Sequence, residues 1–434
     1  MVIEIWINDI SRHSLLKGNP ISLGRTDAQY GLDPPLRFGF AGQTRCRLGA
    51  TKIGMTKKHI PAIIFRMNTA PINKKARPEP CRRVVLGLSG GVDSAVAAYL
   101  LNEQGYEVFG VYLKNWTEKD EKGVCPAERD REDAMRVAAK LGISFRTVDY
   151  EKEYRDRVFA PFLEGLSRGV NPNPDILCNP LVKFAALCAV ADDLGAPFIA
   201  TGHYARVIKA KPCAQGETLL AAGLDKEKDQ SYFLSRITKE QLARTIFPIG
   251  ELMKPQVRAI ASQIGLHVAD KEGTSGICFI GERNFENFMK GRVTAAPGPI
   301  VDTAGKTVGE HRGLPFYTVG QRHGFGGGGG EPQYVAKKIV ETNTLVVAPA
   351  YDPALFRNEI EAIDQHWIGN EPSFPLKCSA RLRYRHALQS CTVKIQSKTG
   401  CLVLDFVEPQ KAVTPGQYAA FYDNDVCLGS AVIV

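Results

Sequence analysis

The sequence lacks several patterns that assign a chain to a common class. Its 11 cysteines include no CxxC pair, so neither a zinc knuckle nor the disulfide framework of a small secreted domain is indicated. No apolar run approaches the roughly 18 residues of a membrane-spanning helix, and we expect no membrane partner. We therefore expect a protein of a reducing compartment, with no metal site and with most thiols serving as small core residues.

Acidic residues are absent from one long stretch. Between Leu36 and Pro78 there is no Asp or Glu, and residues 1–83 hold 15 Lys and Arg against 5 Asp and Glu. The formal net charge of +9 therefore belongs to this part, and the remainder is close to neutral. Any RNA-binding role must rest on local basic patches rather than on the total charge.

Residues 1–80 show no amphipathic period and mix Pro, Gly, Asn and Arg, which predicts a disordered basic extension. The shortage of acid is typical of an organelle transit segment. Residues 1–10 carry two acids and do not look like a presequence. Translation from Met55 or Met67 and a basic arm without an address, which would leave the protein cytoplasmic, are the alternatives.

The lysine-containing phosphate loop, GxxxxGK[ST], is also missing. In its place SGGVDS, Ser89 to Ser94, lies between a buried apolar strand, Val84 to Leu88, and an apolar helix start, Ala95 to Leu101. Gly90 and Gly91 let backbone N–H groups approach a ligand, and the positive end of the helix points to the same place. The stretch predicts a phosphate cradle that uses ATP differently from a lysine-containing loop.

Strands and helices alternate after this loop. Tyr106 to Tyr112 and Ile143 to Val148 are predicted strands, with a predicted helix from Asp130 to Leu141 between them. That order predicts an α/β doubly wound parallel sheet, whose ligand crevice lies beyond the carboxyl ends of the strands. Leu113 and Gly202 follow predicted strands and would face the crevice.

A loop rich in Pro and Asn carries the first candidate nucleophile. Arg168 to Phe184 (RGVNPNPDILCNPLVKF) predicts an irregular segment ahead of a helix from about Leu181. Cys178 lies near a helix N-terminus and Lys183, surroundings that lower the pKa of a thiol and favour thiolate. Cys278 lies 100 residues later in a glycine-flanked segment, so only the fold could bring the two thiols together.

Beyond about Gly291 the pattern becomes all-β, with short alternating strands and turns. We expect a small β-rich domain over 291–350 and a C-terminal β-barrel over 351–434. One predicted strand, Ala380 to His386, places arginines around Tyr384, a pattern suited to phosphates and base stacking. An ordinary exposed strand face is the alternative.

Six motifs occur in order: SGGVDS, NPDILCN, ATGHYAR, KDQSYFL, GICFIGER and YTVGQR. On these motifs the chain resembles the tRNA-specific 2-thiouridylases of the PP-loop ATP pyrophosphatase superfamily, from Arg82 to its end. GVC with DREDA, and TIFPIG, look like the mitochondrial branch. The resemblance implies a catalytic PP-loop domain over 81–290, two β domains that bind tRNA, and a mitochondrial location.

The resemblance also implies the chemistry. The enzyme would make 2-thiouridine at the wobble position of lysine, glutamate and glutamine tRNAs, after adenylation of the C2 oxygen by ATP. A donor protein would supply sulfur as a persulfide on Cys278. Cys178 would attack that persulfide and leave a Cys178–Cys278 disulfide for a reductant, with Asp175 as acid or base.

Site residues follow from the same resemblance. ATP, with Mg²⁺ on its phosphates, would be held by Gly87, Leu88, Ser89, Gly90, Gly91, Val92, Asp93, Ser94, Leu113 and Gly202. The tRNA contacts would be Asn173, Pro174, Asp175, His203, Lys228, Asp229, Gln230, Arg383, Tyr384 and Gln417. His323, where many relatives have lysine, and the run Gly326 to Gly330 depart from the family pattern and would weaken a tRNA contact.

Two other functions stay open at this point. A PP-loop amidotransferase or ligase would use the same ATP site but would not need the cysteine pair. A catalytically inactive tRNA-binding protein would keep the β domains but lose SGGVDS or a cysteine, and both are present.

Overall fold

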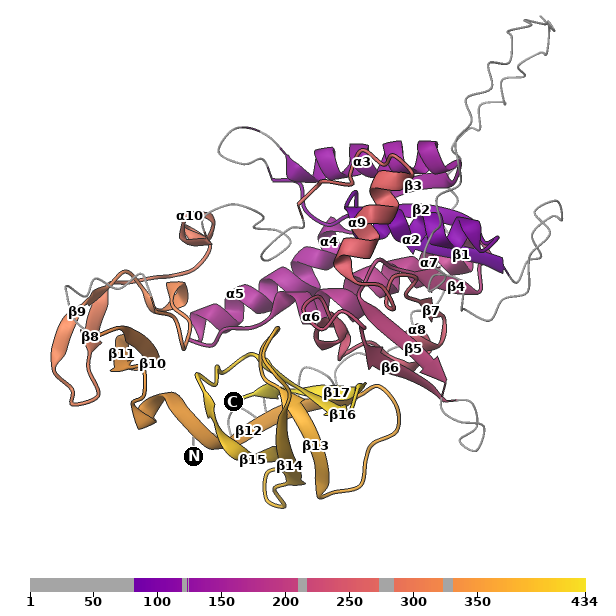
Figure 1. Ribbon diagram of the computed structural model, residues 1–434. Coiled ribbons are helices and arrows are strands. Elements are labelled where there is room, and N and C mark those ends of the chain that lie inside the picture. Colours follow the sequence, from indigo (N-terminus) through magenta and orange to yellow (C-terminus); the bar gives the residue numbers. More distant parts are fainter. Residues whose placement is uncertain (1–81, 119–122, 124, 210–216, 273–284, 323–330) are drawn as a thin grey trace, which may run out of the picture. The chain divides into compact units, whose positions relative to one another are not determined.

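The computed structural model describes residues 82–118, 123, 125–209, 217–272, 285–322 and 331–434, which belong to one compact unit (Figure 1). Four features named above lie outside the described residues: the extension over 1–80, Cys278, His323 and the run Gly326 to Gly330.

A five-stranded parallel sheet forms the first part, in the order β3-β2-β1-β4-β7. The central strand β1 buries Val84, Val85 and Leu86 completely, as expected of a parallel strand covered on both faces. Helices α2 and α7 pack on β1, and α3 packs on β2 and β3, which confirms the doubly wound α/β fold. The strands are β1 (Arg83–Gly87), β2 (Glu107–Lys114), β3 (Ser144–Asp149), β4 (Phe198–Ala200) and β7 (Thr245–Ile246).

The helices of this part alternate with the strands along the chain. They are α2 (Val92–Glu103), α3 (Pro126–Leu141), α4 (Glu151–Tyr154), η3 (Arg155–Phe159), α5 (Ala160–Ser167), α6 (Pro174–Cys178), η4 (Asn179–Phe184), α7 (Ala185–Asp193), η5 (Ser231–Leu234), α8 (Lys239–Ala243), α9 (Lys254–Gln263) and α10 (Phe285–Met289).

Segments α6, η4 and α7 form one helical stretch from Pro174 to Asp193. The predicted loop was wrong here, because the helix begins at Pro174 rather than near residue 181. Asn173 caps it by accepting the Asp175 N–H at 3.2 Å, and proline suits the first helical position. The stretch has a mean hydropathy of 1.4, enough by length and composition for a membrane span, but 61% of it is buried inside the protein, as in a core helix.

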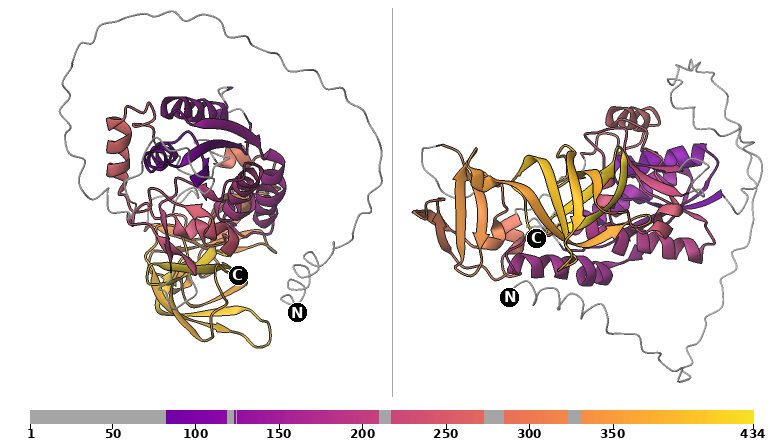
Figure 2. Two further views of the ribbon diagram at one scale, coloured as in Figure 1. Left: turned by 90° about the vertical axis from the view of Figure 1, so that its right-hand side faces the viewer. Right: turned by 90° about the horizontal axis from the view of Figure 1, so that it is seen from below.

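The C-terminal part is a closed antiparallel barrel of six strands, which confirms the predicted barrel (Figure 2). Strand β17 pairs with β12 and closes the ring β12-β15-β14-β13-β16-β17. The edge of β17 that pairs with β12 also pairs, at Val426 and Cys427, with β6 of the β5–β6 hairpin, so one eight-stranded sheet joins the first part of the chain to the barrel. The strands are β5 (Ala205–Lys209), β6 (Thr218–Ala222), β12 (Phe356–Trp367), β13 (Leu376–Arg381), β14 (Gln389–Ile395), β15 (Leu402–Lys411), β16 (Tyr418–Asp423) and β17 (Val426–Ile433).

In the sequence, residues 298–349 between these two parts form a four-stranded sheet in the order β10-β11-β8-β9, the small β-rich element that the sequence predicted. Its core is formed by Ile300, Leu314, Tyr317, Val335, Leu345 and Val347. Its elements are β8 (Gly298–Val301), β9 (Thr307–His311), η6 (Leu314–Phe316), β10 (Gln333–Ile339) and β11 (Thr344–Pro349), with η7 (Pro353–Leu355) leading into the barrel.

A buried ion pair crosses from the first part of the chain to the barrel. Arg381 Nη1 lies 2.8 Å from Asp229 Oδ2, and the two side chains are 11% and 0% exposed. Asp229 also accepts the N–H of Gly223 and both the N–H and the hydroxyl of Ser231, each at 3.0 Å. These bonds compensate the desolvation of the carboxylate, which a single partner rarely does.

Strand β13 ends at Arg381, so the predicted strand to His386 was wrong in its second half. Residues 382–388 form a turn, in which Arg385 has φ +66°. The arginines consequently do not share one strand face: Arg381 is buried in the ion pair, whereas Arg385 is exposed.

Replacing Arg381 tests the buried pair. We expect Arg381→Met to lower the free energy of unfolding by about 3–5 kcal/mol, because it leaves the Asp229 charge buried without its cation. The double variant Asp229→Asn/Arg381→Met should recover part of the loss. Chemical denaturation measures both, with Lys226→Met as control: its pair with Asp425 is exposed at 60% and 54%, and should cost no more than about 1 kcal/mol. Equal losses in Arg381→Met and in the control would contradict the assignment.

Candidate functional site

The phosphate loop leaves the carboxyl end of β1 and turns into α2. Gly90 has φ +77°, and a Cβ there would collide with the Asp130 carbonyl oxygen, so only glycine fits. The Ser94 hydroxyl accepts the Ser89 N–H and donates to the Gly91 carbonyl, each at 3.1 Å. The loop is therefore held open, with the unpaired N–H groups of the first turn of α2 beside it.

Gly202 meets this loop from the neighbouring strand β4. A Cβ on Gly202 would lie 2.6 Å from the Ser94 nitrogen and 2.8 Å from the Asp93 carbonyl carbon, so the two backbones are in direct contact. Leu113, near the end of β2, is partly buried against the core of the same sheet. The structure thus brings these predicted ATP residues to one edge of the sheet, and ATP binding itself stays a prediction.

Two lysines that the sequence analysis missed also reach the loop. Lys254, the first residue of α9, lies 2.7 and 2.8 Å from the two carboxylate oxygens of Asp93, and the Tyr204 hydroxyl donates to the same carboxylate at 2.8 Å. Lys271 donates to the Gly90 carbonyl at 3.1 Å. No local signal marks these lysines, because they follow the loop by at least 160 residues.

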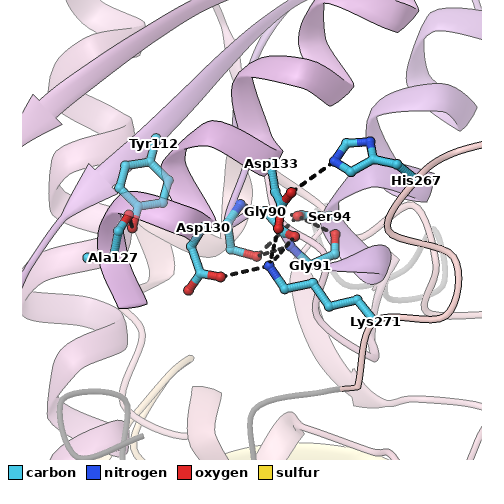
Figure 3. Close-up of polar contacts among 10 residues, drawn as sticks. Gly90, Gly91, Ser94, Tyr112, Ala127, Asp130, Asp133, His267 and Lys271 are labelled. Carbon is cyan, nitrogen blue, oxygen red and sulfur yellow. Dashed lines mark hydrogen bonds and ion pairs between the residues drawn. The ribbon is translucent and has the colours of Figure 1, made fainter. Parts of the chain in front are cut away.

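Lys271 also binds two acids of α3 (Figure 3). Its Nζ lies 2.7 Å from Asp130 Oδ1 and 2.6 Å from Asp133 Oδ2, and His267 lies 3.0 Å from the other oxygen of Asp133. Burial is the largest single influence on Asp133 and opposes its ionisation, but the hydrogen bonds and charges of Lys271 and His267 together outweigh it, so the pKa of this carboxyl is lowered. Lys271 and His267 therefore connect the segment after α9 to the phosphate loop and to α3 through hydrogen bonds and ion pairs.

Cys178 is fully buried at the end of α6. It belongs to an apolar cluster with Trp116, Phe162, Phe288 and Met289 among others. Burial raises its pKa to about 11, and the nearby Lys183 only partly offsets this effect. The predicted thiolate-favouring surroundings were therefore wrong for this conformation: Cys178 lies near the start of the helical stretch, but desolvation outweighs the lysine.

Three of the motifs meet around Asn171 and Asn173. Asn173 Nδ2 donates to Gln417 Oε1 at 3.3 Å, and Gln417 Nε2 donates to the Asn171 carbonyl at 2.6 Å. Asn171 Nδ2 donates to the Tyr317 carbonyl at 3.3 Å. The NPNPD segment, the TPGQ turn of the barrel and the YTVGQR motif thus contact one another. Asn173 and Gln417 are partly exposed there, whereas Asn171, Pro174 and Tyr317 are buried.

The KDQSYFL motif and the turn after β13 also come together. The rings of Phe233 and Tyr384 lie 4.5 Å apart, and the Arg385 guanidinium lies 5.3 Å from the Tyr384 ring centre. Lys228 is partly exposed, whereas the Asp229 carboxylate is enclosed. A tRNA contact therefore stays a prediction for Lys228, but this conformation gives the Asp229 side chain a structural role instead.

Two further predicted tRNA residues have internal partners. Gln230 Oε1 accepts the Tyr204 N–H at 3.0 Å. His203 Nδ1 lies 2.7 Å from the Thr201 hydroxyl, and its ring stacks on Phe184 with centres 6.2 Å apart. Burial, assisted by the Lys183 cation, lowers the pKa of His203 to about 3. The imidazole is consequently neutral at physiological pH and cannot bind a phosphate as a cation.

The raised pKa of Cys178 predicts slow alkylation. A shift from 9.0 to about 11 lowers the thiolate fraction at pH 8 about 100-fold relative to an ordinary cysteine, and the fraction rises tenfold per pH unit until about pH 11. We expect iodoacetamide labelling of Cys178, followed by peptide mass spectrometry, to increase with that slope while the protein stays folded. Cys178 labelled as fast at pH 8 as the partly exposed Cys188 would contradict this.

Three family models match the chain in succession. The tRNA methyl transferase HUP domain matches residues 82–282, the tRNA methyl transferase PRC-barrel domain matches 286–349, and the aminomethyltransferase beta-barrel domain matches 357–433. These ranges contain, in turn, the parallel sheet, the four-stranded sheet and the barrel.

Curated relatives match over nearly their whole length. The tRNA-specific 2-thiouridylase MnmA 1 of Geobacillus kaustophilus is 50% identical over 357 residues, covering 81% of this chain and 95% of the relative. The tRNA-specific 2-thiouridylase MnmA of Paracidovorax citrulli is 48% identical over 367 residues, covering 82% and 96%. Among solved structures, NMN synthetase from Francisella tularensis is 20% identical in sequence. The match covers 50% of this chain and 74% of that chain, with a TM-score of 0.31.

Proposed function

This chain belongs to the tRNA-specific 2-thiouridylase family and is a tRNA sulfurtransferase that forms 2-thiouridine. On that premise, we propose that it adenylates the C2 oxygen of the wobble uridine and then replaces this oxygen with sulfur from a cysteine persulfide. One observation carries the proposal. The fold places a phosphate loop at the carboxyl end of β1, and it places Cys178 on the helix that begins within the NPNPD segment.

The shape of the phosphate loop supports ATP as the co-substrate. Bound there, ATP would supply the adenylyl group that makes the C2 oxygen a leaving group. Gly90, Gly91 and the first turn of α2 would bind its phosphates, with Leu113 and Gly202 beside them, because glycines allow close backbone approach and the first turn of a helix presents N–H groups without intrahelical partners. Residues Gly87 to Ser94 would together form this cradle.

The acids near the loop bear on Mg²⁺. Asp93 is paired with Lys254, and Asp130 and Asp133 are paired with Lys271. Among the described residues no group of three His, Cys, Asp or Glu side chains could hold a metal ion. Mg²⁺ would therefore be bound mainly by the phosphates of ATP and by water, as this cation prefers.

The two cysteines would divide the sulfur chemistry. A donor protein would load Cys278 as a persulfide, and the Cys178 thiolate would attack the inner sulfur. The outer sulfur would leave as hydrosulfide and add to C2, AMP would depart with the oxygen, and a Cys178–Cys278 disulfide would remain for a dithiol to reduce. Asp175, three residues before Cys178, would act as acid or base.

Chain length permits this encounter. Cys278 follows Lys271 by seven residues and precedes Phe285 by seven, and seven residues span at most about 25 Å. Lys271 binds the phosphate loop, and Phe288 and Met289 of α10 pack in the cluster that encloses Cys178. The segment that carries Cys278 is thus attached at one end beside the phosphate loop and at the other end beside Cys178. Cys178 would become accessible only when this cluster opens.

The surface formed by the NPNPD segment, the TPGQ turn and the turn after β13 would bind tRNA. Tyr384 would offer a stacking face, and Arg383, Lys228 and Gln417 would offer hydrogen-bond donors to the tRNA. The target uridine would be turned out of its stack, because C2 cannot be reached within a helix of bases. We propose the lysine, glutamate and glutamine tRNAs as substrates.

The rival functions fit less well. An amidotransferase or ligase would not account for relatives that are 48–50% identical over 95–96% of their length and are named as thiouridylases. An inactive tRNA-binding protein would not need to retain the phosphate loop together with Cys178 and Cys278.

Serine substitutions test the cysteine roles. We expect Cys178→Ser and Cys278→Ser each to abolish 2-thiouridine formation while ATP and tRNA still bind, because the nucleophile or the sulfur carrier is lost but the binding surfaces are kept. Nucleoside mass spectrometry of the tRNA measures the product, and filter binding measures affinity. Cys188→Ser is the matched control and should keep activity. Thiolation retained in either variant would refute the assigned roles.

We also propose a mitochondrial location, supported by the acid-free stretch from Leu36 to Pro78. A fluorescent-protein fusion that begins at Met1 or at Met55 should enter mitochondria. One that begins at Met67 lacks most of the basic stretch and should stay in the cytoplasm. Cytoplasmic signal from every fusion would instead support a basic arm without an address.

A further inference from the structure

Two cysteines face each other at the base of the β13–β14 hairpin. Cys378 on β13 and Cys391 on β14 are directly paired residues of neighbouring antiparallel strands. Their sulfur atoms lie 3.7 Å apart. Among the cysteines that the structure describes, this is the pair whose sulfurs are in contact, and neither residue belongs to the proposed thiolation chemistry.

The geometry is close to that of a disulfide. Side chains directly opposite each other on antiparallel strands have Cβ atoms about 4.5–5.5 Å apart, whereas a disulfide needs about 3.5–4.5 Å. An approach of the two strands by about 1 Å would therefore allow a bond. No segment has to unfold, because both strands stay paired on their other edges, β13 with β16 and β14 with β15.

The two thiols differ in environment. Cys378 is partly exposed, whereas Cys391 lies in the barrel core with only 5% of its surface exposed. The hydrogen bond from the Cys378 thiol lowers the pKa of Cys391, and the same contact raises the pKa of Cys378. The pair therefore holds a first negative charge more easily than an isolated buried thiol does, and Cys378 is the sulfur that a dissolved reagent meets first.

The turn of the hairpin that these cysteines bracket carries two of the proposed tRNA contacts. Residues 382–388, including Arg383 and Tyr384, form the turn between the two strands. A bond between Cys378 and Cys391 would close a covalent ring around this turn, in addition to the hydrogen bonds of the strands.

We propose that Cys378 and Cys391 form a dithiol–disulfide site that exchanges with low-molecular-weight disulfides such as glutathione disulfide. Once the proton shared by the two contacting sulfurs lies on Cys391, attack of the Cys378 thiolate on glutathione disulfide would give a mixed disulfide and release one glutathione. Cys391 would then attack the Cys378 sulfur and release the second. Overall two thiols lose two electrons and two protons, and one glutathione disulfide becomes two glutathiones. Any effect on tRNA binding rests on the proposed function, but the disulfide itself does not.

Peptide mapping of the full chain tests the site. After incubation with glutathione disulfide and blocking of free thiols, trypsin cuts after Lys377, Arg381, Arg385 and Lys394, so Cys378 and Cys391 fall in separate peptides, 378–381 and 386–394. We expect the two peptides to be recovered as one disulfide-linked species that dithiothreitol separates. In Cys391→Ser the mixed disulfide on Cys378 should accumulate by about tenfold relative to the unsubstituted chain, because the resolving thiol is missing.

Controls separate the pair from chance oxidation. Cys427→Ser, at a buried barrel cysteine paired with Leu220, should behave like the unsubstituted chain. Cys391→Ala provides an apolar alternative should serine in the core prevent folding, and it should give the same accumulation. Equal levels of the mixed disulfide with and without Cys391, or two thiols that both stay free in glutathione disulfide, would overturn the proposal.

Discussion

The ion pair between Asp229 and Arg381 is the contact on which the arrangement of the site depends. A fully buried carboxylate is tolerated only when a cation and hydrogen-bond donors surround it, and here the donors come from residues 223 and 231 while the cation comes from the barrel. With the shared β6–β17 pairing, this pair fixes the barrel against the KDQSYFL segment. The NPNPD segment, the TPGQ turn and the turn after β13 can therefore act as one surface.

Burial gives Cys178 a resting state that differs from the thiolate that its proposed role requires. A thiol with a pKa of about 11 is protonated and unreactive at neutral pH, which protects it from oxidants and alkylating agents. A nucleophile in persulfide chemistry must nevertheless become a thiolate. The apolar cluster around Cys178 includes Phe288 and Met289 of α10, which follows Cys278 in the chain. In the proposed mechanism, arrival of the persulfide and exposure of the Cys178 thiol would therefore be coupled.

The phosphate loop shows how charge can be supplied from a distance. A lysine inside the loop is absent, yet Lys254 and Lys271 reach Asp93 and the Gly90 carbonyl from beyond α8. Both lysines are held by acids, so the loop keeps nearby cations without a large net positive charge. This balance would suit the proposed reaction, in which the site binds ATP and releases pyrophosphate.

Features that depend on residues adjacent in the sequence could be predicted from the sequence. Glycine and hydroxyl spacing at Ser89 to Ser94 defined the loop, alternation of strands and helices defined the parallel sheet, and ordered motifs indicated the family. Tertiary structure alone decided whatever depends on distant neighbours: the protonated state of Cys178, the burial of Asp229, the lysines at the loop and the contact of Cys378 with Cys391. Desolvation, ion pairing and sulfur contact are set by distance in space, and no local pattern encodes that distance.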